Sequence, residues 1–259
     1  MDSAVVQPRM YEVIVLKEGY SVSEGPGQQK ACGTITLVKG PQNIIVDTGN
    51  PWDRDLILEG LASLDLTPAD VDYVIGTSGN TDKLGNLNLF TRATHIVSGE
   101  VSHGDSYQCH GFGQGIPYEI DEFVEVMPTP GHTGSDVSVI VKNTSKGTVA
   151  ITDWHHSQNS GFSPYCHSMN SRFRDLFECL DDLENPNLWQ RNSEHPELQQ
   201  QNRIEILQIA DFIIPGHGPM FQVPDEYKHQ MKMVMFYEYK EVTDGSSTSR
   251  EYKEYFEEF

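Results

Sequence analysis

The sequence lacks the features that would place the protein in a membrane or outside the cell. It has no run of about 18 apolar residues, so we expect no membrane-spanning helix. Its first residues do not form a basic-then-apolar leader, and its 4 cysteines form no C-x-x-C pair. We therefore expect free thiols in a reducing compartment, the cytoplasm or alternatively the nucleus.

Basic residues are also scarce. The 259 residues include 18 Lys and Arg against 38 Asp and Glu, a net charge of −20. Because nucleic acid and anionic membranes attract basic surfaces, this balance disfavours both as partners. We expect a small molecule or a protein as the partner, with a homodimer formed through the aromatic C-terminal tail as an alternative.

Several catalytic motifs are missing as well. There is no G-x-S-x-G elbow and no phosphate-binding P-loop, so serine hydrolysis and nucleotide phosphoryl transfer lack support. Cys109-His110 and Cys166-His167 are only neighbours in sequence, and buried structural thiols are the better interpretation.

Short strands separated by turn signals dominate the sequence, with amphipathic helices between them. Two successive strand-then-helix halves predict an α+β protein, a four-layer αββα sandwich. The predicted strands are 11–16, 34–38, 43–46, 71–75, 95–98, 124–127, 138–141, 148–152 and 211–214, the helices are 52–64, 173–183 and 203–210, and 19–28 is predicted as a loop.

Four turns carry side chains that bind metals in other proteins. Asp82 follows an apolar strand, His132 lies in a T-P-G-H turn, Asp153 ends another strand and His217 lies in a P-G-H-G turn. A single histidine in a glycine-rich turn is more often structural, but the four together in this order indicate one site.

These turns resemble the metallo-β-lactamase fold. The segments 45–52, 85–90 and 136–139 are more narrowly similar to the animal metallo-β-lactamase domain-containing protein 1 subfamily. The resemblance covers 11–222 as one domain, with 1–10 as an extension and 223–259 as an acidic, aromatic tail. It implies an αββα sandwich with two metal ions at one edge, a hydrolase ancestry and, for that subfamily, an endoribonuclease acting on histone pre-mRNA 3′ ends.

The family's metal-binding loop reads H-x-H-x-D-H, and the segment 76–83 resembles that loop without its histidines. The resemblance assigns His132 to the first metal site, whose other ligand positions hold Ser78 and Asn80. Asp153 matches the bridging aspartate. Two neutral side chains are poor zinc ligands, so we expect the first site to be empty.

In the second site the resemblance places Asp82 and His217 as ligands, with Lys83 where a third histidine would stand. Asp82, Asp153 and His217 form a set of oxygen and nitrogen donors that suits one divalent ion, zinc or manganese. Alternatively, the Lys83 ammonium takes the vacated position and holds Asp82 and Asp153 together, or Lys83 points to solvent. A site rebuilt with histidines from other loops, such as His155 or His156, is a further alternative.

Two functional interpretations follow. In the first, the chain is a non-catalytic or impaired relative of a metal-dependent hydrolase, a pseudoenzyme that works as a binding or scaffold protein. In the second, it is an active metal-dependent hydrolase of phosphodiesters that uses one ion at Asp82, Asp153 and His217.

Overall fold

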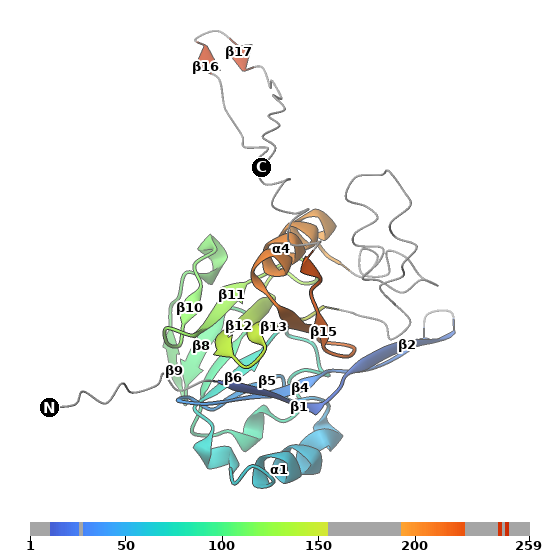
Figure 1. The fold of residues 1–259 in the computed structure, drawn as a ribbon, viewed down its shortest axis with the longest axis vertical. Helices are drawn as coiled ribbons and strands as arrows, with labels where there is room; N and C mark the ends of the chain where they lie inside the picture. The colour runs from blue at the N-terminus through green and yellow to red at the C-terminus, as the bar shows by residue number, and fades with distance from the viewer. Residues whose placement is uncertain (1–10, 26–27, 155–192, 226–242, 245–246, 249–259) are drawn as a thin grey trace, which may run out of the picture.

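A computed structural model describes residues 11–25, 28–154, 193–225, 243–244 and 247–248 (Figure 1). The predicted helix at 173–183, the histidines at 155 and 156, the Cys166-His167 pair and most of the tail lie outside these residues. No helix in the described part of the chain is long and apolar enough to cross a membrane.

Two sheets form the centre of the molecule. The first has the strand order β1-β4-β5-β6-β7-β8-β9, with β5, β6 and β7 parallel to one another. Its strands are β1 (Glu12–Lys17), β4 (Ile35–Lys39), β5 (Ile44–Val46), β6 (Tyr73–Gly76), β7 (Thr94–Val97), β8 (Glu100–His103) and β9 (Ser106–Gln108).

The second sheet has the order β10-β11-β12-β13-β14-β15, in which only β13 and β14 are paired in parallel. Its strands are β10 (Tyr118–Glu119), β11 (Val124–Pro128), β12 (Val137–Thr144), β13 (Gly147–Ile151), β14 (Phe212–Ile214) and β15 (Phe221–Gln222). A small separate pair joins β16 (Thr243–Asp244) to β17 (Ser247–Thr248).

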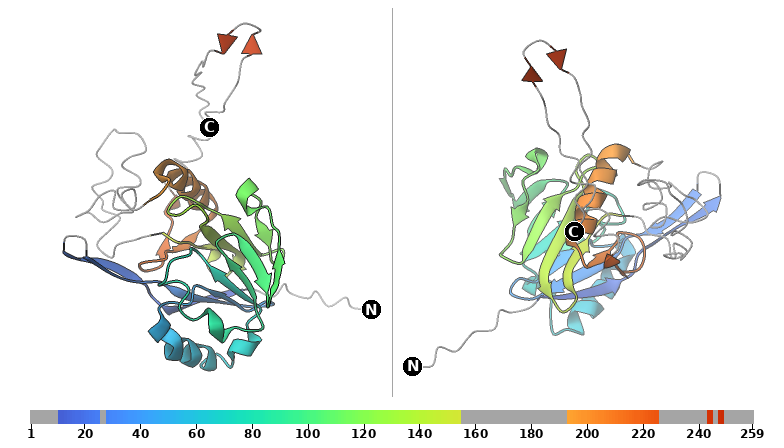
Figure 2. Two further views of the ribbon diagram at one scale, coloured as in Figure 1. Left: turned by 180° about the vertical axis from the view of Figure 1, so that it is seen from behind. Right: turned by 45° about the horizontal axis from the view of Figure 1, so that its top comes forward.

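Helices cover the outer faces of both sheets, α1 (Arg54–Ala62) on the first and α4 (Pro196–Ile209) on the second (Figures 1 and 2). In the described part of the chain, four short 3₁₀ helices lie in the connections: η1 (Pro51–Asp53), η2 (Pro68–Asp70), η3 (Leu87–Leu89) and η4 (Phe112–Gln114). The layers therefore run helix, sheet, sheet, helix, and the predicted αββα sandwich is confirmed.

Alternation along the strands explains these layers. In β5, Ile44 and Val46 pack between the sheets, whereas Ile45 packs beneath α1. In β12, Val139 packs between the sheets and Ile140 beneath α4. A strand that is buried on both faces needs an uninterrupted apolar run, which is the pattern that predicted these strands.

The prediction of a loop at 19–28 is wrong. These residues belong to a β-hairpin formed by β2 (Tyr20–Gly25) and β3 (Gln28–Cys32), which extends away from the sandwich (Figures 1 and 2). Tyr20 and Val22 are 39% and 49% exposed. Because this hairpin does not line the core, its sequence carries no regular apolar face that would reveal a strand.

The other errors have similar causes. Strands β8, β9 and β10 are missing from the prediction, and β9 is exposed along its whole length. The helix predicted at 203–210 begins earlier, at Pro196, because its first turns are polar and hide the apolar periodicity.

The same substitution, valine to alanine, made once inside and once outside the sandwich, tests which residues belong to the core. Val126 is 0% exposed between the sheets. We expect Val126→Ala to lower the free energy of unfolding by about 2 kcal/mol, because it removes buried methyl groups and leaves a cavity. Val22→Ala, in the exposed hairpin, should change it by less than about 0.5 kcal/mol. Equal losses in urea unfolding would contradict this assignment of the core.

Candidate functional site

The ends of four strands meet at one edge of the sandwich. Asp47 follows β5, Thr77 follows β6, Asp153 follows β13 and the turn containing His217 follows β14. Two backbone hydrogen bonds join the sheets there, from Val137 N to Thr77 O at 2.9 Å and from Thr34 N to Gly216 O at 2.8 Å. The loops from both sheets therefore share one rigid edge.

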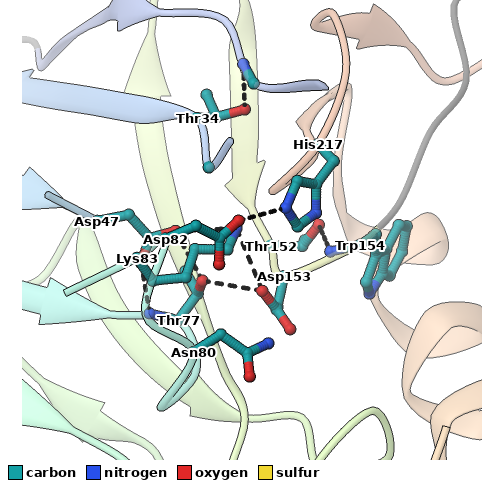
Figure 3. Close-up of polar contacts among 12 residues, drawn as sticks. Thr34, Asp47, Thr77, Asn80, Asp82, Lys83, Thr152, Asp153, Trp154 and His217 are labelled. Atoms are coloured by element: carbon teal, nitrogen blue, oxygen red, sulfur yellow. Dashed lines mark hydrogen bonds and ion pairs between the residues drawn. The ribbon is translucent and has the colours of Figure 1, made fainter. Parts of the chain in front are cut away.

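Lys83 lies at the centre of this edge with its side chain fully buried. Its Nζ lies 3.2 Å from Asp153 Oδ1 and 3.3 Å from Asp47 Oδ2, so one ammonium pairs with a carboxylate from each sheet (Figure 3). Its backbone oxygen accepts a 2.6 Å hydrogen bond from Thr48 N, which fixes the loop against the end of β5.

Glycines leave the room that this ammonium needs. A Cβ atom at Gly216, in the P-G-H-G turn, would collide with Lys83 Nζ. A Cβ at Gly33 would press on the backbone oxygen of Asp82 and on the Lys83 side chain. Both positions therefore require glycine for a steric reason, because the lysine side chain fills the adjacent space.

Asp47 is a residue that the sequence analysis did not include in the site. It accepts hydrogen bonds from Thr77 N and Thr77 Oγ1, both at 2.7 Å, and its φ of 59° lies in the left-handed region. The signal was present: a carboxylate follows an apolar strand at Val46-Asp47, as it does near the end of β13 at Asp153. Asp47 supplies the second carboxylate of the Lys83 pair.

Asp82 pairs with His217 instead of Lys83. Asp82 Oδ2 lies 2.7 Å from His217 Nε2 (Figure 3). Burial lowers the pKa of His217, and repulsion from the Lys83 ammonium lowers it further. Burial alone would raise the pKa of Asp82, but the hydrogen bond from His217 and the charge of Lys83 hold it below its usual value. The pair is therefore a neutral imidazole that donates Nε2–H to a carboxylate.

The remaining predicted side chains lie in the loops that follow β6 and β11. Asn80 Nδ2 lies 3.4 Å from His132 Nε2, and both residues are partly buried. Ser78 is fully buried, and its hydroxyl has no hydrogen-bond partner among the described residues. Asp153 Oδ1 also lies 3.4 Å from Thr77 Oγ1.

The tertiary structure thus decides between the alternatives for Lys83. The expectation that it points to solvent is wrong, because its side chain is 0% exposed. The expectation that it neutralises carboxylates holds for Asp153, but the second partner is Asp47 where Asp82 was expected. Within the described residues, no group of three or more His, Cys, Asp and Glu side chains has the arrangement that holds a metal ion.

Buried charge perturbs protonation at this edge. Burial by itself would lower the pKa of Lys83, but the carboxylates of Asp47 and Asp153 raise it above the ordinary 10.5. Burial raises the pKa of Asp47 from 3.8 to about 6, although attraction to Lys83 opposes that rise. At neutral pH the site therefore contains a charged lysine between carboxylates.

The raised pKa of Asp47 gives a testable pH dependence. The folded chain takes up a proton at Asp47 near pH 6, whereas the unfolded chain does so near pH 3.8. Folding stability supplied by this proton is therefore gained as pH falls from about 7 to about 4 and is lost as pH rises. Urea unfolding should show that the wild type becomes more stable relative to Asp47→Asn as the pH falls from about 7 to about 4. The exposed control Asp55→Asn should keep the wild-type profile; a pH-independent difference for Asp47→Asn would contradict the assignment.

Comparison with known proteins places this geometry in a family. The Metallo-beta-lactamase superfamily model matches residues 33–145. Metallo-beta-lactamase domain-containing protein 1 of Xenopus laevis is 41% identical over 225 residues, which cover 86% of each chain. The human protein of the same name is 36% identical over 243 residues, 82% of each chain.

Solved structures support the fold. A candidate metallo-beta-lactamase from Thermotoga maritima superposes with a TM-score of 0.54 at 18% identity, over 82% of this chain and 99% of that one. An N-acyl homoserine lactone hydrolase has a TM-score of 0.50 at 16% identity, over 81% and 92%. Extended sequence identity and shared architecture agree: the chain belongs to the metallo-beta-lactamase superfamily, in the family of metallo-beta-lactamase domain-containing protein 1.

Proposed function

We propose that this chain is a non-hydrolytic member of its superfamily that works as a binding protein, with the Lys83 ammonium in place of the metal ions. The observation that carries the proposal is the fully buried Nζ of Lys83 between Asp153 and Asp47, at 3.2 and 3.3 Å. The chain thus supplies its own cation to carboxylates that metal ions would otherwise neutralise.

The donor set argues in the same direction. A catalytic zinc ion needs about three protein ligands with imidazole or thiolate among them and one open position for water. At the family's first metal site, the loop after β6 offers the neutral side chains of Ser78 and Asn80. His132, from the loop after β11, supplies the one imidazole of that site. A divalent ion next to Asp153 would also face the positive charge of Lys83, which repels it. The residues present therefore do not fit the family's two-ion centre.

A metal-dependent hydrolase is the second candidate. The observation that favours it is the contact of Asp82 with His217 near Asp153, since these three side chains would be the ligands of a single ion. Against it, His217 Nε2 is hydrogen-bonded to Asp82 Oδ2 at 2.7 Å, so a metal ion would have to displace this hydrogen bond to use that nitrogen. The overall charge of −20 also disfavours the anionic RNA substrate that the family resemblance implies.

Metal content decides between these candidates. We expect the protein, purified with zinc and manganese present and then dialysed, to retain far less than one metal ion per chain by elemental analysis. We also expect no chelator-sensitive cleavage of bis-p-nitrophenyl phosphate. As a matched control, the triple variant Ser78→His, Asn80→His, Lys83→His restores the family's histidines and should gain zinc. About one ion per wild-type chain, lost in His217→Ala, would support the hydrolase and overturn the proposal.

The ammonium should also be needed for stability. Lys83→Met leaves buried carboxylates without their cation, and we expect it to lower the free energy of unfolding by about 3–5 kcal/mol. Lys142→Met is the matched control, because Lys142 pairs with Glu125 at 2.9 Å while 46% exposed and should cost about 0–1 kcal/mol. Urea unfolding measures both variants. If Lys83→Met costs no more than Lys142→Met, then Lys83 does not neutralise the site.

A further inference from the structure

Strand β9 is an outer edge of the first sheet, on the side of the molecule opposite to the β2–β3 hairpin (Figures 1 and 2). It pairs with β8 on one side, and in the described part of the chain no strand pairs with its other side. All three of its residues are exposed, and Tyr107 is 70% exposed. The free side of an edge strand presents backbone N–H and C=O groups to which a further strand can pair.

This edge lacks the features that prevent such pairing in other proteins. Charged side chains, prolines and bulges protect most edge strands. The opposite edge of the same sheet is β1, which carries Glu12 and Lys17 and has a bulge between Val15 and Lys17. The sequence of β9 is S-Y-Q, with no charge and no proline, and its pairing with β8 has no bulge. The contrast indicates that another strand covers β9.

The neutral character extends beyond the strand. No Asp, Glu, Lys or Arg occurs from 106 to 118, although these residue types make up 22% of the chain. The same segment carries two large exposed apolar side chains, Tyr107 and Ile116, and Ile116 is 53% exposed. Two copies of a chain with a net charge of −20 repel each other, so a neutral segment is where they can approach most closely.

The core holds the residues that follow β9 in place. Phe112 belongs to the cluster between the sheets, and the centroid of its ring lies 4.5 Å from that of His110 and 6.5 Å from that of Tyr118. His110 Nε2 lies 3.1 Å from the carbonyl oxygen of Ile116. These contacts fix the loop that presents Ile116, so a partner would meet a formed surface that loses little conformational entropy on binding.

We propose that β9 pairs with β9 of a second copy of this chain, antiparallel about a twofold axis, to form a homodimer with Tyr107 and Ile116 in the contact. A second copy fits this edge because a twofold interface brings the same neutral segment together from both chains, so that no charged side chain of one segment faces a like charge of the other. A strand of three residues spans only about 10 Å, so the interface is small and the dimer weak. The inference goes beyond the proposed function and does not depend on the state of the Lys83 site.

Sedimentation of the full chain over a range of micromolar concentrations tests the proposal. The mass should rise with concentration from the 29.1 kDa of one chain toward twice that value. Tyr107 is the middle residue of β9, so Tyr107→Lys places two ammonium groups close together at the twofold axis and should weaken dimerisation about tenfold. Trp52→Lys is the matched control, because Trp52 is 77% exposed before α1 and the change in charge is the same. It should dimerise like the wild type.

Hydrogen exchange locates the contact. The backbone amides of 106–108 should exchange more slowly as the wild-type concentration rises, and this dependence should be lost in Tyr107→Lys. A wild type that stays monomeric at every concentration would overturn the proposal, and slow exchange at 106–108 in that monomer would mean that another segment of the same chain covers β9.

A dimer that forms equally well in Tyr107→Lys would also overturn the proposal, because its contact would lie on another surface, such as the aromatic C-terminal tail. None of these outcomes depends on metal content, which is the measurement that decides the proposed function. Failure of the dimer and failure of the metal-free function can therefore be told apart.

Discussion

The structure depends on one buried cation. The carboxylates of Asp47 and Asp153 come from different sheets, and both are buried. An unpaired charge in the interior of a protein costs about several kcal/mol. The Lys83 ammonium lies within ion-pair distance of both. The adjoining features follow from this constraint: glycine at position 216 leaves space for Nζ, and Thr77 donates two hydrogen bonds to Asp47.

The fold accounts for where the site lies but not for what the site does. Loops from both sheets reach one edge of the αββα sandwich because β5, β6, β13 and β14 all end there. Proteins with this architecture include hydrolases, such as the N-acyl homoserine lactone hydrolase that superposes on this chain. Architecture is shared among many activities, so function has to be argued from the side chains at that edge. In this chain those side chains include a lysine at the centre.

The two oxygens of the Asp153 carboxylate have different surroundings. Oδ1 lies 3.2 Å from the Lys83 ammonium, whereas Oδ2 is buried and accepts no hydrogen bond from the described residues. The edge remains negatively charged, because Asp47, Asp82 and Asp153 outnumber the single ammonium of Lys83 among these ion-paired side chains.

The sequence alone determined the sandwich, most of its strands and the turns at Asp82, His132, Asp153 and His217, because apolar runs and glycine turns are local patterns. It also showed a lysine where the family has a histidine. Only the tertiary structure decided that Lys83 points inward, that Asp47 is its second partner and that Asp82 pairs with His217. These contacts join residues that are 36, 70 and 135 positions apart in the sequence. The direction of a side chain at such a contact depends on whether the neighbouring backbone leaves space for it. That space is set by how one sheet packs on the other.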